Sequence, residues 1–465
     1  METKTEVTKA SPHTSTSSKQ FWNLTWPIWI EMLLGLVMGN SDTLMLSFLS
    51  DHAVAAVALA NQYIMLALLL MQVIATGTQV VLSQYLGARR WEESDRITFS
   101  CISLNVLAGG LFSLILVIAR EPLLRLLHIA PELMADASAY LLIVGGFLFL
   151  QSLVNGISGV LKVYGHVREA MLISVGMNVL HIGTNMVMIF GMLGFPAMGV
   201  QGAALSTVIS RLAAAVVLFI LLLKLRSLRL RWTSLVKFHL SDLRNMLKIG
   251  VPAAIEAFTY HLVQTAFLAF ISTMGTEALA ARQYAMNITM FISVFGTALG
   301  FANSILVGKL TGAGRYQEAY EQTRRSMSWS FMAAIVVIVL FIIFRHPLIG
   351  LFSQNPLVLK WGGQLLMLNL LVETGRVLNM NLVSALNAAG DAKFPVWMGL
   401  IFMVGLSLPA GYGLAISAGM GLVGIWIATG LDEWLRGLAN LYRWNSRRWE
   451  SYTLVKQAQN RQTSL

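Results

Sequence analysis

The stretch GARRWEE at residues 87–93 recurs as GAGRYQE at residues 312–318, 225 positions later. Two further matches share this offset: Pro27 and Glu31 recur as Pro252 and Glu256, and residues 161–165 recur as residues 386–390. Three matches at one offset indicate an internal repeat. We therefore expect two halves of the chain to share one fold.

Long apolar runs lie on both sides of each copy. Of the 465 residues, 56% are hydrophobic and 12% are charged, whereas charged residues make up about 25% of a typical soluble domain. The mean hydropathy is +0.67. So many apolar side chains cannot be hidden in a water-soluble core behind so few charges. The composition predicts a polytopic protein embedded in a lipid bilayer.

The apolar runs predict twelve membrane spans, because a helix needs about 20 apolar residues to cross a bilayer. The runs cover residues 22–48, 54–83, 97–119, 139–161, 170–192, 199–224, 250–272, 278–308, 327–344, 362–388, 395–416 and 421–444. Six spans per repeat make both halves face the same way, as in many secondary transporters. The predicted fold is an all-α membrane protein with twelve transmembrane helices in two pseudo-symmetric six-helix bundles.

Lysine and arginine predict the orientation of these spans. With the N-terminus inside, the inner segments hold 25 of the 33 Lys and Arg residues, and the outer loops hold four, namely Arg120, Arg125, Arg345 and Lys360. We therefore expect both termini in the cytoplasm and the chain in the inner (plasma) membrane. The net charge of +11 lies beside the spans, so we expect no nucleic-acid partner.

The expected domains follow from the spans. They are a polar cytoplasmic tail (1–20), an N-lobe with spans 1–6 (21–224), a basic cytoplasmic linker (225–249), a C-lobe with spans 7–12 (250–444) and a second cytoplasmic tail (445–465). The single cysteine, Cys101, excludes an intramolecular disulfide and a cysteine-based metal centre.

Polar side chains inside the first half predict a cation site. Asp42 lies on the first span, and Asn178, His181 and Asn185 follow at spacings of three and four on the fifth, where they share one stripe. Thr207 lies on the sixth span. We expect Asp42 to gather with these groups into a proton or sodium site, because a carboxylate beside neutral polar groups binds either ion. The alternative is a set of hydrogen bonds that only pack helices together.

The second half repeats this pattern. Glu256, Tyr260 and Gln264 form a stripe on the seventh span, and Gln283 and Asn287 lie one turn apart on the eighth. Glu256 has no basic residue within a turn on its own helix, so burial would favour its protonated form and suit proton coupling. The alternative is a protonated structural residue.

Other charged groups are expected to be structural. Glu373 and Arg376, three residues apart on the tenth span, are interpreted as an internal ion pair. Arg211, Arg282 and the group Asp432, Glu433 and Arg436 are expected near span ends, where snorkelling or pairing explains them.

With these residues in place, the chain resembles the multidrug and toxic compound extrusion (MATE) family, specifically its bacterial members. The similar stretches are Pro27, Glu31 and Asp42 with NSDTLMLSFLS at 40–50, GVPAAIEAF at 250–258, ALAARQYAMNI at 278–288, ILVGKLTGAGRYQEA at 305–319 and LVSALNAAGDAKFP at 382–395. The resemblance covers residues 21–444.

The resemblance implies a V of two lobes with a substrate cavity between them, and export of organic cations in exchange for protons or sodium. It implies that Asp42 is the carboxylate of the N-lobe cation site, that Pro27 is the helix-bending proline, and that Asn185 and Thr207 are polar members of that site. His181 falls where the family often has Asn, which weakens a sodium assignment. Glu256 matches the acidic residue of the seventh span, and Arg376 replaces a tenth-span acidic residue of some sodium-coupled members.

We therefore expect an ion-coupled antiporter for multidrug (xenobiotic) efflux of amphiphilic or cationic small molecules. We expect no cofactor beyond H⁺ or Na⁺, with sodium, if used, at Asp42, and a monomeric chain. An enzyme is not expected, because no catalytic cluster or phosphate-binding loop is present. The alternative is a lipid-linked oligosaccharide flippase, which would need a more cationic cavity for pyrophosphate.

Overall fold

The computed structural model describes residues 18–224 and 240–454, and every regular element within them is helical. The first half contains α1 (Ser18–Ser47), α2 (Asp51–Gly87), α3 (Trp91–Ile118), the short α4 (Arg120–Leu126), α5 (Pro131–Tyr140) continued by the π-helical Leu141–Gly145, α6 (Leu148–Tyr164), α7 (Val167–Phe190) and α8 (Gly199–Lys224).

The second half has the same order of elements. It contains α9 (Leu240–Ser272), α10 (Thr276–Gly312), α11 (Tyr316–Ile343), the short α12 (Arg345–Gly350), α13 (Pro356–Ala389), α14 (Lys393–Gly399), the π-helical Leu400–Ser407, α15 (Leu408–Tyr412), the π-helical Gly413–Ser417 and α16 (Leu422–Asn445). A short 3-10 helix, Arg448–Ser451, follows.

These elements confirm the predicted fold class. Within the described residues, nine helices are long and apolar enough to cross a membrane, and the bent pair Pro131–Gly145 and Leu148–Tyr164 gives a tenth span. The helices α13 and α16, which carry several buried charged and amide side chains, complete the twelve.

Two details differ from the sequence-based expectation. The fourth span, expected at 139–161, is formed by two helices bent by 42° relative to each other, where a π-helical turn meets Gly145 and Gly146. The expected linker, 225–249, lies outside the described residues up to 239, and its last part is helical because α9 already begins at Leu240. The larger parts of both expected tails, 1–17 and 455–465, also lie outside the described residues.

The two bundles meet along α2, α9 and α10. In this contact, equivalent residues of the two repeats face each other. A Cβ atom on Gly87 would lie 2.0 Å from the carbonyl oxygen of Lys309, and a Cβ atom on Gly312 would lie 2.0 Å from that of Gln84. Gly87 and Gly312 occupy equivalent positions in the repeat, as do Gln84 and Lys309. The helices α2 and α10 therefore approach each other reciprocally, at a distance that only glycine allows.

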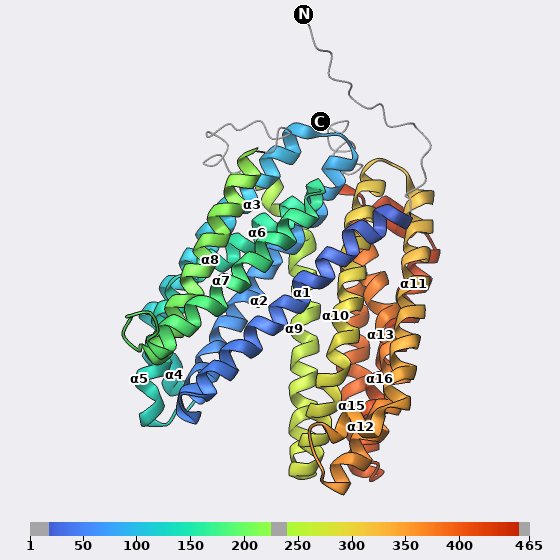
Figure 1. Cartoon of the computed structure of the whole chain (residues 1–465). Helices are drawn as coiled ribbons and strands as arrows, with labels where there is room; N and C mark the ends of the chain where they lie inside the picture. The colour runs from blue at the N-terminus through green and yellow to red at the C-terminus, as the bar shows by residue number, and fades with distance from the viewer. Residues whose placement is uncertain (1–17, 225–239, 455–465) are drawn as a thin grey trace, which may run out of the picture.

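This contact closes one end of the molecule. In Figure 1 the two bundles converge at the end where α1 begins and diverge towards the other end, which gives the pair the outline of a V. The largest apolar cluster lies at the converging end and takes residues from both halves, including Phe21, Val81 and Ile305. The helix α1 packs against α7 of its own bundle and against α10 of the other.

Candidate functional site

The predicted carboxylate site in the first bundle is assembled from three helices. Asp42 lies near the end of α1, and its side chain is 16% exposed. The amide of Asn185 on α7 donates a hydrogen bond of 2.6 Å to Oδ1 of Asp42. Nε2 of His181, one turn earlier on α7, lies 3.4 Å from the same oxygen. Thr207 on α8 contacts His181 at 3.2 Å.

The contacts of Thr207 favour one tautomer of His181. The hydroxyl of Thr207 lies 2.9 Å from the carbonyl oxygen of Ala203, to which it can donate its hydrogen. With the hydrogen placed there, the Thr207 oxygen accepts in the contact with His181, which corresponds to the tautomer with a hydrogen on Nε2. That N–H also faces Asp42, so His181 acts as a donor towards the carboxylate. Nδ1 of His181 is buried and has no partner among the described residues.

The donor set around Asp42 combines nitrogen and oxygen atoms. Sodium, like other hard cations, prefers oxygen ligands, and the Nε2 of His181 offers a hydrogen where a ligand would offer a lone pair. The described residues contain no group of three or more His, Cys, Asp or Glu side chains that could hold a metal ion. Two groups in this cluster have a lone pair that can take a proton, the Asp42 carboxylate and Nδ1 of His181.

Asn178 lies apart from this cluster. Its amide donates to the carbonyl oxygen of Ser174 at 2.8 Å. Seven residues along a helix correspond to about 10 Å, so the stripe on α7 is too long for Asn178 and Asn185 to reach the same carboxylate. Asn178 instead lines a separate cavity of about 250 Å³, together with Glu31 and Arg211.

Pro27 and Glu31 occupy the earlier part of α1, which continues through the proline as one helix. The Glu31 carboxylate is bound by Nζ of Lys162 at 2.8 Å and by the hydroxyl of Ser158 at 3.2 Å. Glu31 therefore forms a direct ion pair with a residue of α6. Asp42 is instead in direct contact with Asn185 and His181, and the charge of Arg211 on α8 acts on it from further away. The bend expected at Pro27 stays a prediction.

The predicted set of the second bundle divides between two places. Glu256 on α9 lies 4.0 Å from Nη1 of Arg436 on α16. The expectation that Glu256 has no nearby counter-charge is therefore wrong, because the cation arrives from a distant part of the chain. Arg436 is shared, since its guanidinium also lies 2.6 Å from Asp432 and 3.0 Å from Glu433.

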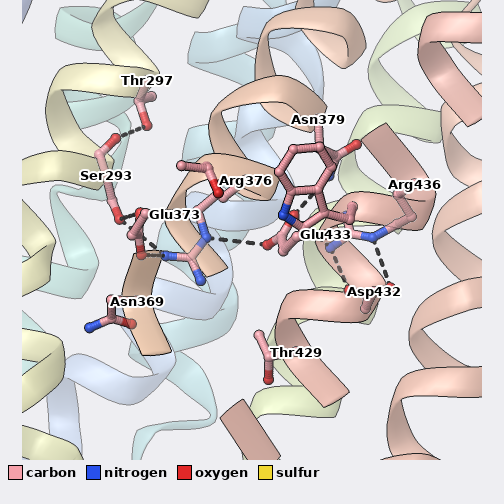
Figure 2. A network of polar contacts seen from close by, with 12 residues as sticks. Ser293, Thr297, Asn369, Glu373, Arg376, Asn379, Thr429, Asp432, Glu433 and Arg436 are labelled. Atoms are coloured by element: carbon pink, nitrogen blue, oxygen red, sulfur yellow. Dashed lines mark hydrogen bonds and ion pairs between the residues drawn. The ribbon is translucent and has the colours of Figure 1, made fainter. Parts of the chain in front are cut away.

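Glu433 joins this group to a second one, as Figure 2 shows. Arg376 on α13 contacts Glu433 at 3.2 Å and Glu373 at 2.5 Å. The hydroxyl of Ser293 on α10 lies 3.2 Å from Arg376. Asn379 donates a hydrogen bond of 3.0 Å to Glu433. Two arginines and four carboxylates thus form one buried network, and the predicted internal ion pair of Glu373 and Arg376 is present within it.

The other predicted residues of this bundle line a cavity of about 290 Å³. They are Tyr260, Gln264, Gln283 and Asn287, and Glu256 is not among the residues that line it. Gln283 and Asn287 are hydrogen-bonded to each other at 2.9 Å. Glu373 and Arg376 form part of the opposite wall.

Two arginines, Arg211 and Arg282, are more deeply buried than the sequence analysis expected. Arg211 lies in the middle of α8 rather than near its end, and its residue is 9% exposed, with Nε and Nη1 unpartnered among the described residues. Arg282 lies two turns into α10, and its residue is 8% exposed. Each lines a cavity. The available signal was that each is an ionisable residue inside a span, which marks a functional candidate by default.

Known proteins resemble the chain over nearly its full length. The MatE family model matches residues 27–187 and 252–413, one segment in each repeat. The uncharacterized transporter YisQ of Bacillus subtilis (strain 168) is 41% identical over 428 residues, which cover 92% of this chain and 94% of that protein. The probable multidrug resistance protein NorM of Thermotoga maritima is 26% identical and covers 94% of each chain.

A solved structure shows the same fold. The Vibrio cholerae MATE transporter VcmN in the bent form has a TM-score of 0.86 at 20% sequence identity, and the match covers 95% of this chain and 100% of that one.

Proposed function

Because the chain belongs to the MATE family of multidrug efflux transporters, we propose that it is a secondary antiporter of the plasma membrane. It exports amphiphilic or cationic compounds in exchange for protons or sodium ions, and the donor set around Asp42 favours protons. The observation that carries this proposal is the contact of Asp42 with Asn185 and His181, since a partly buried carboxylate held by neutral donors changes charge without breaking an ion pair.

The helix α1 connects Asp42 mechanically to the second bundle. At its start, Trp22 packs against Phe295 and Trp329 of the second bundle, with ring centroids 6.5 and 5.8 Å away. At its end, Asp42 is bound to α7 of the first bundle. A change in charge at Asp42 alters the second attachment and leaves the first, so α1 can move one lobe relative to the other. Only an ion that binds the two states with different affinity shifts their balance.

The expected orientation predicts which side of the membrane is closed in this conformation. The Lys and Arg distribution favours cytoplasmic termini, and the bundles converge at the end where α1 begins (Figure 1). With that orientation the cytoplasmic side is closed and the lobes diverge outwards. Inward proton movement down the membrane potential supplies about 2.3 kcal/mol per charge per 100 mV for the return.

Glu256 is a second candidate coupling residue in this proposal. Its one basic neighbour among the described contacts, Arg436, is also held by Asp432 and Glu433. The positive charge of Arg436 is therefore already balanced by Asp432 and Glu433. Because Arg436 does not depend on Glu256 for a counter-charge, Glu256 could still exchange a proton. Tyr260, Gln264, Gln283 and Asn287 serve as substrate-facing groups of the C-lobe cavity rather than as partners of Glu256.

Ethidium efflux from cells tests the proposal. Cells that express the chain should lose ethidium faster than cells with an empty vector, and the Asp42→Asn and Glu256→Gln variants should each lose most of this gain. Glu132→Gln, at an exposed position of α5, is the matched control and should behave as wild type. Undiminished efflux in both Asp42→Asn and Glu256→Gln would refute coupling through these carboxylates.

A further inference from the structure

The cavity of about 290 Å³ in the second bundle contains a cation that its own walls do not neutralise. The charged residues that line it are Arg282, Glu373 and Arg376. Glu373 and Arg376 are paired with each other at 2.5 Å. Arg282 forms no ion pair within the described part of the chain, and its recorded hydrogen bond is to the amide oxygen of Gln264, at 3.4 Å.

Two side-chain amides in this cavity accept hydrogen bonds through their oxygen atoms, which leaves their NH₂ groups available as donors. The oxygen of Gln264 accepts from Arg282, and the oxygen of Asn369 accepts from Nε1 of Trp426 at 2.9 Å. Both partners are groups that only donate, so neither amide can be turned round. Each amide therefore has its NH₂ group left to bind something else. That of Asn369 is buried and has no partner among the described residues.

The remaining walls combine polar side chains with aromatic and sulfur-containing ones. The polar ones are Gln283, Asn287, Thr289, Ser293 and Thr429, and the aromatic and sulfur-containing ones are Tyr260, Phe267, Met286, Met290 and Trp426. A site with one guanidinium and neutral N–H donors matches a single negative charge. A doubly charged phosphate would need further cations, and Glu373 in the opposite wall would repel it. The aromatic and sulfur-containing side chains match an aromatic body, and the volume suits a small acid or one end of a larger compound.

We propose that Arg282 and the Asn369 amide form a carboxylate-binding subsite in the C-lobe cavity, which recognises aromatic acids or zwitterions. This inference rests on the proposed transport function and deepens it, because it assigns a binding group to those amphiphilic substrates that carry an acid. Arg282 is then a specificity-determining residue, since it contacts the substrate carboxylate and takes no part in ion coupling.

Binding of dansylglycine to the purified full-length chain in detergent tests the proposal, with dansylglycine methyl ester as the matched uncharged probe. Energy transfer from tryptophan to the dansyl group reports binding, and no ion gradient is needed. Wild type should bind the acid more tightly than the ester. A hydrogen bond to a charged group is strong enough that Arg282→Gln should weaken binding of the acid about tenfold or more and leave the ester unchanged.

Three further variants make the result specific. Arg282→Lys keeps the charge and should retain part of the preference for the acid. Asn369→Asp replaces the free NH₂ group by an oxygen, still satisfies Trp426, and should abolish the preference. Arg125→Gln removes one positive charge from an outer loop, where the Arg125 side chain is 74% exposed, and should change nothing.

Equal binding of acid and ester by wild type, or equal loss in Arg282→Gln and Arg125→Gln, would overturn the proposal. Should Arg282→Gln lose both probes through misfolding, Arg282→Lys decides, because a folded Lys variant without preference for the acid also overturns it. If the chain exports ethidium but wild type does not prefer the acid, the carboxylate subsite is refuted and the transport function stands. If binding of the acid depends on Arg282 but no ethidium is exported, the transport function is refuted and the subsite stands.

Discussion

Nε2 of Gln79 donates a hydrogen bond to Oγ of Ser304 across the two bundles, at 3.3 Å. The two residues occupy equivalent positions in the internal repeat, as Gly87 and Gly312 do. Equivalent residues of the two repeats thus face each other in the contact that holds one end of the molecule closed. The proposed antiport requires this contact to open.

A reversible cross-link at this contact should therefore stop transport. The test uses Gln79→Cys with Ser304→Cys in a Cys101→Ala background, because Cys101 is the single native cysteine. A short bis-methanethiosulfonate forms a disulfide with each thiol and releases two sulfinate groups; it should join the two positions and abolish ethidium efflux. A reducing agent cleaves both disulfides and should restore efflux. The two single-cysteine variants are the controls. Full cross-linking, verified by mass spectrometry, with unchanged efflux would show that this end does not open during turnover.

The segment after α16 is tied to the same closed end, through Gln84. Its amide donates to the carbonyl oxygen of Ala388 at 2.7 Å and accepts from the backbone N–H of Leu454 at 2.8 Å. Gln84→Leu would leave two buried backbone groups unpaired, at a cost of about 1–3 kcal/mol each. We expect faster hydrogen exchange in residues 446–454, measured by mass spectrometry, and little change in α4. Unchanged exchange in 446–454 would contradict the role of Gln84.

The carboxylate network of the second bundle depends on Arg436. Removing one partner of a buried ion pair typically costs about 3–5 kcal/mol, because it leaves uncompensated charge. Arg436→Met should therefore lower the thermal unfolding temperature markedly, and the added substitutions Asp432→Asn and Glu433→Gln should recover much of the loss. A triple variant no more stable than Arg436→Met would show that charge compensation is not what Arg436 supplies.

The sequence predicted the helices well because each span is a local property. An apolar run of sufficient length must be helical in a bilayer, where every backbone polar group needs a partner, so each expected span corresponds to one helix or to one run of consecutive helical elements. The bend in the fourth span was missed because it arises from a π-helical turn at Gly145 and Gly146, and periodicity does not show such a turn.

The candidate site could be predicted only where local spacing decides it. His181 and Asn185 share a helix face one turn apart, and both contact Asp42. Arg436 could not be anticipated beside Glu256, because α16 brings it there through tertiary packing. Arg282 was interpreted as a residue near a span end, and only the packed cavity reveals that its side chain is enclosed.

In the proposed mechanism, Asp42 couples ion movement to export. Transport is to be measured in proteoliposomes that contain wild type or Asp42→Asn, with pH and sodium gradients imposed separately. Wild type should move ethidium against its gradient when a pH gradient is present, and Asp42→Asn should still bind ethidium but not concentrate it. Gradient-driven transport by Asp42→Asn at the wild-type rate would contradict the account.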